Sequence, residues 1–473
     1  MNLANVLRVN AENHGDRTAI RFRGETLSYS EALDVVRALA AQLHAAGIVS
    51  GNRVGLAMRD HPVHLLAHFA AAWLGAVIVP VDHRWTRAEQ RRAVNAFGVK
   101  LLLTDDVTID GVRTATPDPT YAPHSEQPVD LSGADLLVSL SSGTTGRPKG
   151  ALVTHENLYE RFVSQWTAIG YDARDCFGLV TPLFFGAGRS FGMSLLAAGG
   201  SVMLAPPPIK PPEIAEALAD ADVTAAFLPP TLLRRLLPLH EGTPLLDNID
   251  YLIVSGEPLY ANEARECREK ICPNLVSYYA SSEGGGISVL SAAEVEAHAD
   301  TVGIPTFRTE VSIVDGDNRP VGDNEVGRLR YRGPGVATRF LDEDGKLLEA
   351  AADGWFYPGD LAERQPGGFI ALRGRDKEVI IRGGVNVYPA EIERVLTSHD
   401  DVHEAAVVGI ADRDRGETIT AFVAGDVRNT ADLIDYCRER LAPYKVPEAI
   451  HVLEALPKKA SGKIDRRALT ASS

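Results

Sequence analysis

Short apolar runs alternate with helical patterns through most of the first 310 residues. Apolar runs of strand length occur at 101–104, 135–140, 201–205 and 251–255. Apolar side chains recur at helical spacing at 155–168, 212–220 and 260–271. This alternation predicts an α/β fold with largely parallel sheets.

The most apolar stretch, residues 65–81, divides into a helix and a strand. Apolar side chains repeat every three to four residues until Gly75, which ends the helical pattern. Asp60 is expected to cap this helix, and Pro62 suits its first turn. Residues 76–80 then form a buried strand. The run is too short and too interrupted for a membrane span, so no integral membrane segment is expected.

The pattern changes after about residue 305. Strand-like segments separated by Gly and Asp turns predict a small antiparallel region at 310–315, 327–333, 354–360 and 368–374. Beyond Arg375, the pattern predicts helices at 389–398 and 430–441, and strands at 404–410, 418–425 and 449–453. We therefore expect a large N-terminal domain, residues 1–375, and a small α+β domain, residues 376–473.

Composition narrows the function. Of the 473 residues, 45% are hydrophobic and 23% are charged, which is typical of a folded protein with ample core. The formal net charge of −15 argues against binding to nucleic acid. The four cysteines have no zinc-site spacing and the N-terminus has no signal-peptide core, so a reduced, cytoplasmic protein is expected. A homodimer is compatible with the sequence.

A glycine- and hydroxyl-rich loop follows the apolar run at 135–140. Residues 141–150 read SSGTTGRPKG. The glycines let backbone N–H groups approach a ligand, the hydroxyls add donors and Lys149 adds positive charge. This inventory suits a polyphosphate. It is not a Walker A loop, because no Gly-Lys-Ser/Thr closes it into a helix.

This loop resembles the signature phosphate loop of the acyl-adenylate-forming superfamily. That superfamily includes acyl-CoA synthetases, adenylation domains of peptide synthetases and firefly-type luciferases. Nearly the whole chain is similar to the family's motifs in the family's order, at 26–32, 51–56, 255–259, 278–285, 302–305, 327–336, 354–362, 374–393 and 457–467. The resemblance implies a ligase that uses ATP and Mg²⁺ to make an acyl-adenylate from a small carboxylic acid, and then a coenzyme A thioester.

The resemblance also implies which residues bind the nucleotide. Glu283 is expected to hold Mg²⁺, and Ser282 to place a hydroxyl beside the phosphates. Tyr279 is expected to stack on adenine, and Asp360 to accept hydrogen bonds from the ribose. The remaining expected contacts are Ser142, Gly143, Thr144, Thr145, Gly146 and Lys149 at the phosphates, Gly256 and Glu257 at the base edge, and Arg375 near the ribose.

The chemistry joins two anions, the substrate carboxylate and the α-phosphate, so catalysis must be mainly charge neutralisation and alignment. The resemblance gives this role to Lys463, which follows Ser-Gly and can act as a mobile point charge. It makes Asp376 the hinge of a mobile C-terminal lid. The expected tunnel for coenzyme A is lined by Arg382, Gly383 and Gly384.

The acyl pocket is expected along 184–191 and around 278–286. Arg189 is either a contact for a polar group or second carboxylate of the substrate or an ordinary surface or interdomain arginine. The other expected lining residues are Phe184, Phe185, Gly186, Ala187 and Ala280. Phe185 replaces a histidine that the family often has, and Ala280 replaces a glycine and narrows the slot. The pocket favours a compact or aromatic acid.

Two other functions remain open. A stand-alone adenylation enzyme would load a separate acyl or peptidyl carrier protein instead of coenzyme A. A nucleotide-binding regulatory protein without catalysis would have lost its charged groups first. The chain keeps those groups, namely Lys149, Glu283, Asp360, Arg375 and Lys463, which argues against the regulatory reading.

Overall fold

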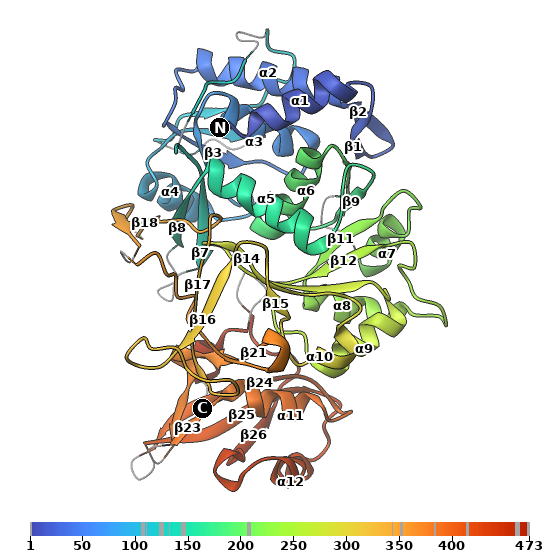
Figure 1. The fold of residues 1–473 in the computed structure, drawn as a ribbon, viewed down its shortest axis with the longest axis vertical. Helices are drawn as coiled ribbons and strands as arrows, with labels where there is room; N and C mark the ends of the chain where they lie inside the picture. The colour runs from blue at the N-terminus through green and yellow to red at the C-terminus, as the bar shows by residue number, and fades with distance from the viewer. Residues whose placement is uncertain are drawn as a thin grey trace.

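The computed structural model describes residues 2–105, 109, 111–122, 127–131, 133–142, 148–205, 210–342, 344–350, 353–382, 385–412, 416–458 and 464–470. Two large mixed sheets and a small antiparallel sheet make up the N-terminal part, and a further sheet forms the C-terminal part (Figure 1). The predicted α/β class is therefore confirmed. Within the described ranges, no helix has the length and apolar character needed to cross a membrane.

The first large sheet is parallel at its centre and antiparallel at its edges. Its order is β15 (Ile304–Pro305), β14 (Gly285–Leu290), β13 (Leu275–Ser281), β12 (Tyr251–Val254), β11 (Ala225–Leu228), β9 (Cys176–Leu179), β10 (Ser201–Leu204), β1 (Thr18–Phe22) and β2 (Glu25–Ser28). The central strands are buried apolar runs, as expected for a parallel sheet covered on both faces.

The second large sheet has the same character. Its order is β19 (Leu347–Glu349), β18 (Arg339–Leu341), β8 (Pro148–Thr154), β7 (Asp135–Ser142), β4 (Val77–Pro80), β3 (Arg53–Ala57), β5 (Val99–Thr104) and β6 (Thr114–Ala115). Strands β4, β3, β5 and β6 are parallel, and β7 joins them parallel to β4. The β18–β19 hairpin, which the sequence did not predict as part of this sheet, extends it beyond β8.

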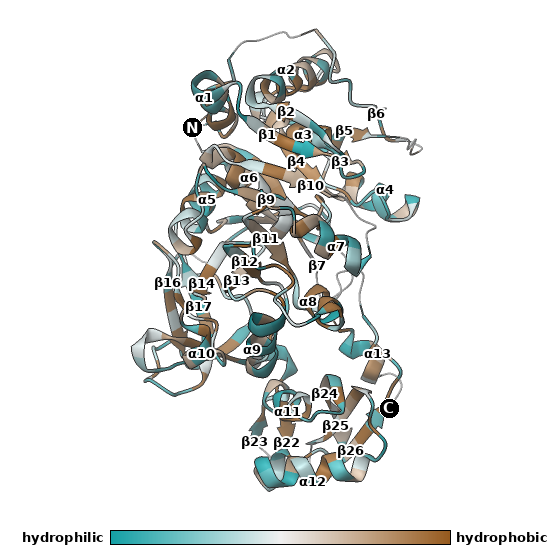
Figure 2. Cartoon of the chain, turned by 90° about the vertical axis from the view of Figure 1, so that its right-hand side faces the viewer, coloured by the Kyte–Doolittle hydropathy of each residue, from teal (hydrophilic) through white to brown (hydrophobic). Residues whose placement is uncertain are grey.

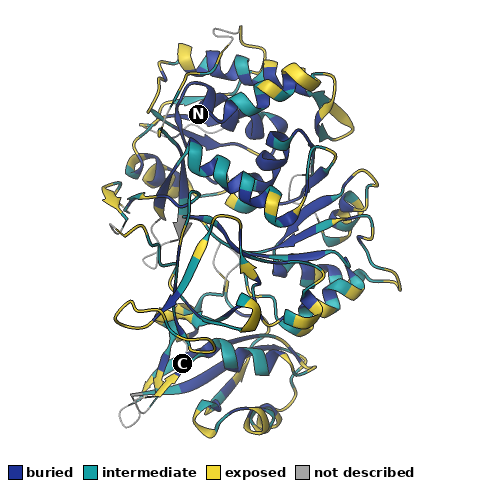
Figure 3. Cartoon of the chain, viewed as in Figure 1, coloured by how far each residue is buried: buried dark blue, intermediate teal, exposed yellow. Residues whose placement is uncertain are grey.

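Helices between and around these sheets pack against them in separate apolar clusters, the largest of which includes residues of α1, α2, α3, α5 and α6. Phe162, Phe177, Phe191 and Trp73 are fully or almost fully buried there, and each contributes about 1.5–3 kcal/mol through burial. Hydrophobic residues gather along the strands in Figure 2, and the same strands are buried in Figure 3. The helices are α1 (Ala4–His14), α2 (Tyr29–Ala45), α3 (Pro62–Trp73), α4 (Arg87–Ala96), α5 (His155–Ile169), α6 (Gly186–Ala198), α7 (Pro211–Leu218), α8 (Pro230–Leu236), α9 (Ala261–Lys270) and α10 (Val295–His298).

The C-terminal third contains the small antiparallel sheet and then a separate mixed sheet. The small sheet is β16 (Glu310–Val314), β17 (Gly327–Arg332), β20 (Asp360–Arg364) and β21 (Ile370–Arg375). The C-terminal sheet is β23 (Val385–Val387), β22 (Ile380–Arg382), β25 (Gly416–Gly425) and β24 (Val402–Asp412), with β26 (Ala449–Val452) beside β25. Its helices are α11 (Pro389–Thr397), α12 (Thr430–Arg440) and α13 (Arg466–Thr470). The division at residue 376 stays a prediction.

Two local expectations were wrong. His61, not Asp60, is the N-cap of α3, because its side chain accepts a hydrogen bond from Val63 N at 3.2 Å. Asp60 instead accepts a hydrogen bond from Leu183 N at 2.7 Å, a long-range contact that local spacing cannot reveal. Residues 354–360 were expected as a strand but form only an isolated bridge between Tyr331 and Phe356 before β20 begins.

Candidate active site

The phosphate loop connects two antiparallel strands. The ladder between β7 and β8 pairs Ser141 with Lys149 and Ser142 with Pro148, so it brings the two ends of the loop together. Lys149 is exposed at this end of the hairpin. The other loop predictions, Gly143, Thr144, Thr145, Gly146 and the Ser142 side chain, lie outside the described residues.

Gly256 and Glu257 follow the carboxyl end of β12. Gly256 has a φ of 98°, in the left-handed region that favours glycine, and a Cβ there would meet nothing within 4 Å. Glu257 accepts a hydrogen bond from the Thr231 hydroxyl at 2.5 Å, and Arg234 lies 3.9 Å from the same carboxylate. Thus Gly256 borders open space, whereas α8 holds the Glu257 side chain.

The turn between β13 and β14 carries Ser282 and Glu283. The Ser281 hydroxyl accepts hydrogen bonds from the N–H groups of Glu283 and Gly284, at 3.2 and 3.0 Å, and lies 2.5 Å from the Tyr331 hydroxyl. This small network fixes the turn backbone. Ser281 and Tyr331 were missed by the sequence analysis, which assigned no role to either.

Glu283 is half-buried, and its carboxylate makes no hydrogen bond or ion pair within the described ranges. Mg²⁺ in nucleotide sites is usually held by one or two carboxylates together with phosphate oxygens and water. An unengaged carboxylate at a fixed turn therefore fits such an ion. No cluster of three or more potential metal ligands occurs in the described part of the chain.

The side chain of Arg161, on α5, binds the backbone of the same turn. Its Nη2 donates to Glu283 O at 2.6 Å, its Nη1 to Ser282 O at 3.3 Å and its Nε to Gly335 O at 2.8 Å. Burial lowers the pKa of Arg161 to about 10, so the guanidinium stays charged near neutral pH. Arg161 was also missed, although one signal was present: it is a charged residue beside Leu158 and Phe162 on the apolar face of a predicted helix.

Asp360 lies at the start of β20, between two donors. The Tyr279 hydroxyl donates to Asp360 Oδ2 at 2.5 Å, and Arg375 Nε lies 3.0 Å from Oδ1. Burial, and next the Asp360 charge, raises the pKa of Tyr279 well above its ordinary value, so this hydroxyl stays protonated and remains a donor. The carboxylate is therefore oriented between these two donors. Stacking of Tyr279 on adenine stays a prediction.

The predicted acyl pocket begins at the loop before α6. Phe184 and Phe185 meet edge to face with their ring centres 5.5 Å apart, and Phe185 is 37% exposed. Gly186 is exposed at the first position of α6, and Ala187 and Ala280 are half-buried. Arg189 is only 4% exposed, so the surface reading of this residue was wrong.

In the C-terminal part, three predicted residues, Lys463, Gly383 and Gly384, lie outside the described residues. Lys458 and Ile464, which flank the stretch containing Lys463 in the sequence, form an antiparallel bridge. Arg466 then pairs with Glu378 at 3.0 Å and with buried Glu393 at 2.9 Å. The chain next to Lys463 is thus tied to a residue that lies just beyond the predicted hinge.

The other two C-terminal predictions have different surroundings. Asp376 is exposed, and its backbone N–H donates to Gly359 O at 3.0 Å. The Arg382 guanidinium donates to Tyr444 O at 2.8 Å and pairs with Glu448. Arg382 is therefore engaged within its own domain, and its role beside coenzyme A stays a prediction.

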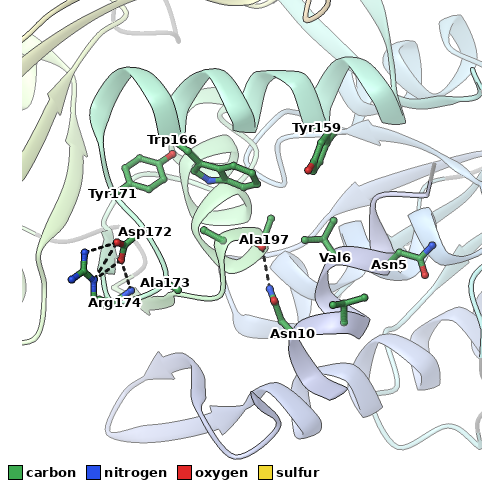
Figure 4. A pocket seen from close by; sticks show the side chains of 12 residues that line it. Asn5, Val6, Asn10, Tyr159, Trp166, Tyr171, Asp172, Ala173, Arg174 and Ala197 are labelled. Atoms are coloured by element: carbon green, nitrogen blue, oxygen red, sulfur yellow. Dashed lines mark hydrogen bonds and ion pairs between the residues drawn. The ribbon is translucent and has the colours of Figure 1, made fainter. Parts of the chain in front are cut away.

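A hollow of about 760 Å³ lies elsewhere, between α1 and the helices α5 and α6. Figure 4 shows its labelled side chains, among them Tyr159, Trp166 and Asn10. Asn10 donates to Ala197 O at 3.0 Å, and Asp172 pairs with Arg174 at 2.6 Å. None of the predicted nucleotide or acyl residues lines this hollow. The hydrogen bond of Asn10 and the ion pair of Asp172 both join parts of the protein itself.

Comparison with known proteins agrees with this geometry. The family model described as AMP-binding enzyme matches residues 7–341, and the model of the AMP-binding enzyme C-terminal domain matches residues 391–463. A 2-succinylbenzoate–CoA ligase of Bacillus licheniformis is 29% identical over 481 residues, covering 99% of this chain and 100% of that relative. A feruloyl-CoA synthase of an Amycolatopsis species is 31% identical over 465 residues, covering 94% of each chain.

Solved structures have the same fold. An o-succinylbenzoate CoA synthetase from Bacillus subtilis, in complex with its acyl-adenylate intermediate, has a TM-score of 0.89 and 28% identity, covering 98% of this chain and 97% of that one. ATP-bound MatB from Rhodopseudomonas palustris has a TM-score of 0.89 at 24% identity, covering 100% and 99%, a likeness of fold alone. The resemblance deduced from the motifs is confirmed, and the chain belongs to the family of AMP-binding enzymes.

Proposed function

We propose that this chain is an AMP-forming acid–CoA ligase that acts on an aromatic carboxylic acid. In the first step the acid and ATP give an acyl-adenylate and pyrophosphate, and in the second step coenzyme A displaces AMP. The observation that carries this proposal is the pair of carboxylates at the strand ends: Glu283 is fixed but unengaged, whereas Asp360 is already oriented. The named activities of the relatives, 2-succinylbenzoate–CoA ligase and feruloyl-CoA synthase, support the aromatic acid.

Each carboxylate serves a different end of ATP. Glu283 would hold Mg²⁺, which when bound neutralises phosphate charge, and Ser282 would add a hydroxyl beside it. Asp360 would accept hydrogen bonds from the ribose, each worth about 1.5–3 kcal/mol for a charged acceptor. A structure of the Bacillus subtilis o-succinylbenzoate synthetase, 28% identical to this chain, holds ATP and a magnesium ion, which supports these cosubstrates.

The acid would approach from the Phe184–Phe185 segment and the first turn of α6. Lys149 and Lys463 would supply positive charge to the polyphosphate and to the reacting carboxylate, because the attack brings two anions together. For the second step the C-terminal domain would turn at Asp376 and admit the coenzyme A thiol. The four cysteines are unpaired and buried, which supports a reducing, cytoplasmic location as part of the proposal.

The test of the proposal is pyrophosphate release with aromatic, short, branched, hydroxy, dicarboxylic and fatty acids, with and without coenzyme A. Products are identified by mass. We expect an acyl-CoA and AMP from an aromatic acid. Formation of an acyl-adenylate without a thioester would indicate that a carrier protein, not coenzyme A, accepts the acyl group. The absence of turnover with every acid would overturn the proposal.

We expect Lys463→Ala to lower the rate of pyrophosphate release by about 10²–10³-fold, the scale for losing one preorganised charged donor. The measurement is single-turnover acyl-adenylate formation. Lys458→Ala is the matched control, because Lys458 lies in the same stretch of sequence and pairs with Glu404 of β24. A near-normal rate for the Lys463 variant would remove this residue from the mechanism.

We expect Asp376→Pro to spare acyl-adenylate formation and to impair thioester formation. Proline fixes φ and also removes the N–H that donates to Gly359 O. Asp376→Ala keeps that N–H and serves as the control. Rates of the two half-reactions are measured separately, and an equal loss in both would contradict a hinge role.

We expect Arg161→Met to lower acyl-adenylate formation by about 10²-fold, because releasing the Ser282–Glu283 turn misplaces its side chains. Arg308→Met is the control, since Arg308 pairs with Glu160 of the same helix but is exposed. Both variants are checked for a cooperative thermal transition. A folded Arg161 variant with normal kcat and KM would show that the turn holds its position without the guanidinium.

A further inference from the structure

Arg189 carries a buried charge that no acidic side chain of the described residues balances. The residue is 4% exposed, and its Nη1 donates to Leu183 O at 3.0 Å and Phe184 O at 3.1 Å. Its Nη2 and Nε make no hydrogen bond in the described part of the chain, and no carboxylate there pairs with it. Taking an unpaired charge out of water is costly, so an uncompensated guanidinium at this place indicates a missing anionic partner.

The side chains of α3 nearest to Arg189 cannot supply that partner. His64 and His68 are both 1% exposed, and His64 Nδ1 and His68 Nε2 lack hydrogen-bond partners in the described ranges. Burial, and next the Arg189 charge, lowers the pKa of His64 to about 3 and that of His68 well below its ordinary value. Both imidazoles are therefore neutral near pH 7 and offer no negative charge.

The neighbouring carboxylates are engaged elsewhere. Asp60 accepts the Leu183 N–H at 2.7 Å, and burial raises its pKa to about 6. Asp82 forms a two-pronged pair with Arg84, at 3.0 and 2.9 Å. The guanidinium carbon of Arg84 in turn lies 4.8 Å from the centre of the Phe184 ring, over its face.

The unused edge of Arg189 faces the start of α6. A Cβ on Gly186 would lie 3.9 Å from Arg189 Nη2, and Gly186 is exposed. The helix has 13 residues, and its N-cap, Phe185, makes no side-chain hydrogen bond to the first turn. The N–H groups of the first turn of α6 and the positive end of its helix dipole therefore lie close to the Arg189 guanidinium.

We propose that Arg189 and the first turn of α6 bind a second carboxylate of the acid substrate, distant from the carboxylate that reacts. The inference rests on the proposed function and deepens it, because it makes the preferred substrate an aromatic dicarboxylic acid. The reacting carboxylate has to reach the nucleotide beside Glu283. A separate anion site at Arg189 and the first turn of α6 therefore binds the far end of the substrate. Phe184 and Phe185 border its aromatic ring.

The test compares three aromatic acids that differ in one substituent: benzoate with hydrogen, with a carboxylate, or with a carboxamide at the far position. For the wild type we expect kcat/KM for pyrophosphate release to favour the dicarboxylate by about tenfold or more, within the range of a hydrogen-bonded charge pair. In Arg189→Met this advantage should vanish, whatever the change in the rate with benzoate. Arg189→Lys should keep part of the advantage.

A second pair of variants avoids truncating a buried side chain. Gly186→Asp would place a carboxylate beside Arg189 Nη2 and fill the site, whereas Gly186→Asn has the same shape without the charge. We expect the aspartate variant alone to lose the preference for the dicarboxylate. Equal preference in both variants, a wild type without preference, or an equal loss with all three acids in folded Arg189→Met would overturn the proposal.

Failure of the ligase function is distinguished by a binding measurement. If no acid is turned over, the melting temperature is measured with terephthalate, without nucleotide. Stabilisation of the wild type but not of Gly186→Asp would still support the subsite. Stabilisation of both proteins, or of neither, would overturn it independently of the reaction.

Discussion

Three stretches that are far apart in the sequence meet at the guanidinium group of Arg161. It binds backbone carbonyl groups of the β13–β14 turn and of the segment after β17, while its own helix follows the phosphate hairpin. Its hydrogen bonds within the described residues all go to backbone carbonyl oxygens, and the nearby Glu283 charge adds an electrostatic attraction. This one buried cation therefore links the helix after the phosphate hairpin, the turn that carries Glu283 and the segment after β17.

Around that point, the polar groups of the site divide into supporting and unengaged ones. The hydroxyls of Ser281 and Tyr331 hydrogen-bond to each other, and Ser281 also binds the turn backbone. Asp360 is bound by the Tyr279 hydroxyl and the Arg375 guanidinium. Supporting groups of this kind hold the others within a narrow range of positions. The unengaged groups, Glu283 and the outer edge of Arg189, are the ones with capacity left for a ligand.

Local sequence signals were sufficient for most elements of the fold. The apolar runs at 101–104 and 251–255 became β5 and β12, and the helical patterns at 155–168 and 389–398 became α5 and α11. The motifs also identified Asp360 and Glu283 at strand ends. What spacing could not provide were partners across long separations: Asp60 binds Leu183, and Arg161 binds a turn 121 residues away. The proximity of Arg189 to His64 of α3, 125 residues earlier, is likewise invisible to local periodicity.

The C-terminal sheet has an apolar core of its own, formed by residues between Ile380 and Ile450, whereas the small antiparallel sheet packs on residues between Ile287 and Ile370. No described core cluster crosses residue 376. A rotation at that position would therefore expose little new apolar surface. Because heat capacity follows apolar exposure, such a movement would leave the heat capacity of the protein almost unchanged, and the enthalpy of the movement would vary little with temperature.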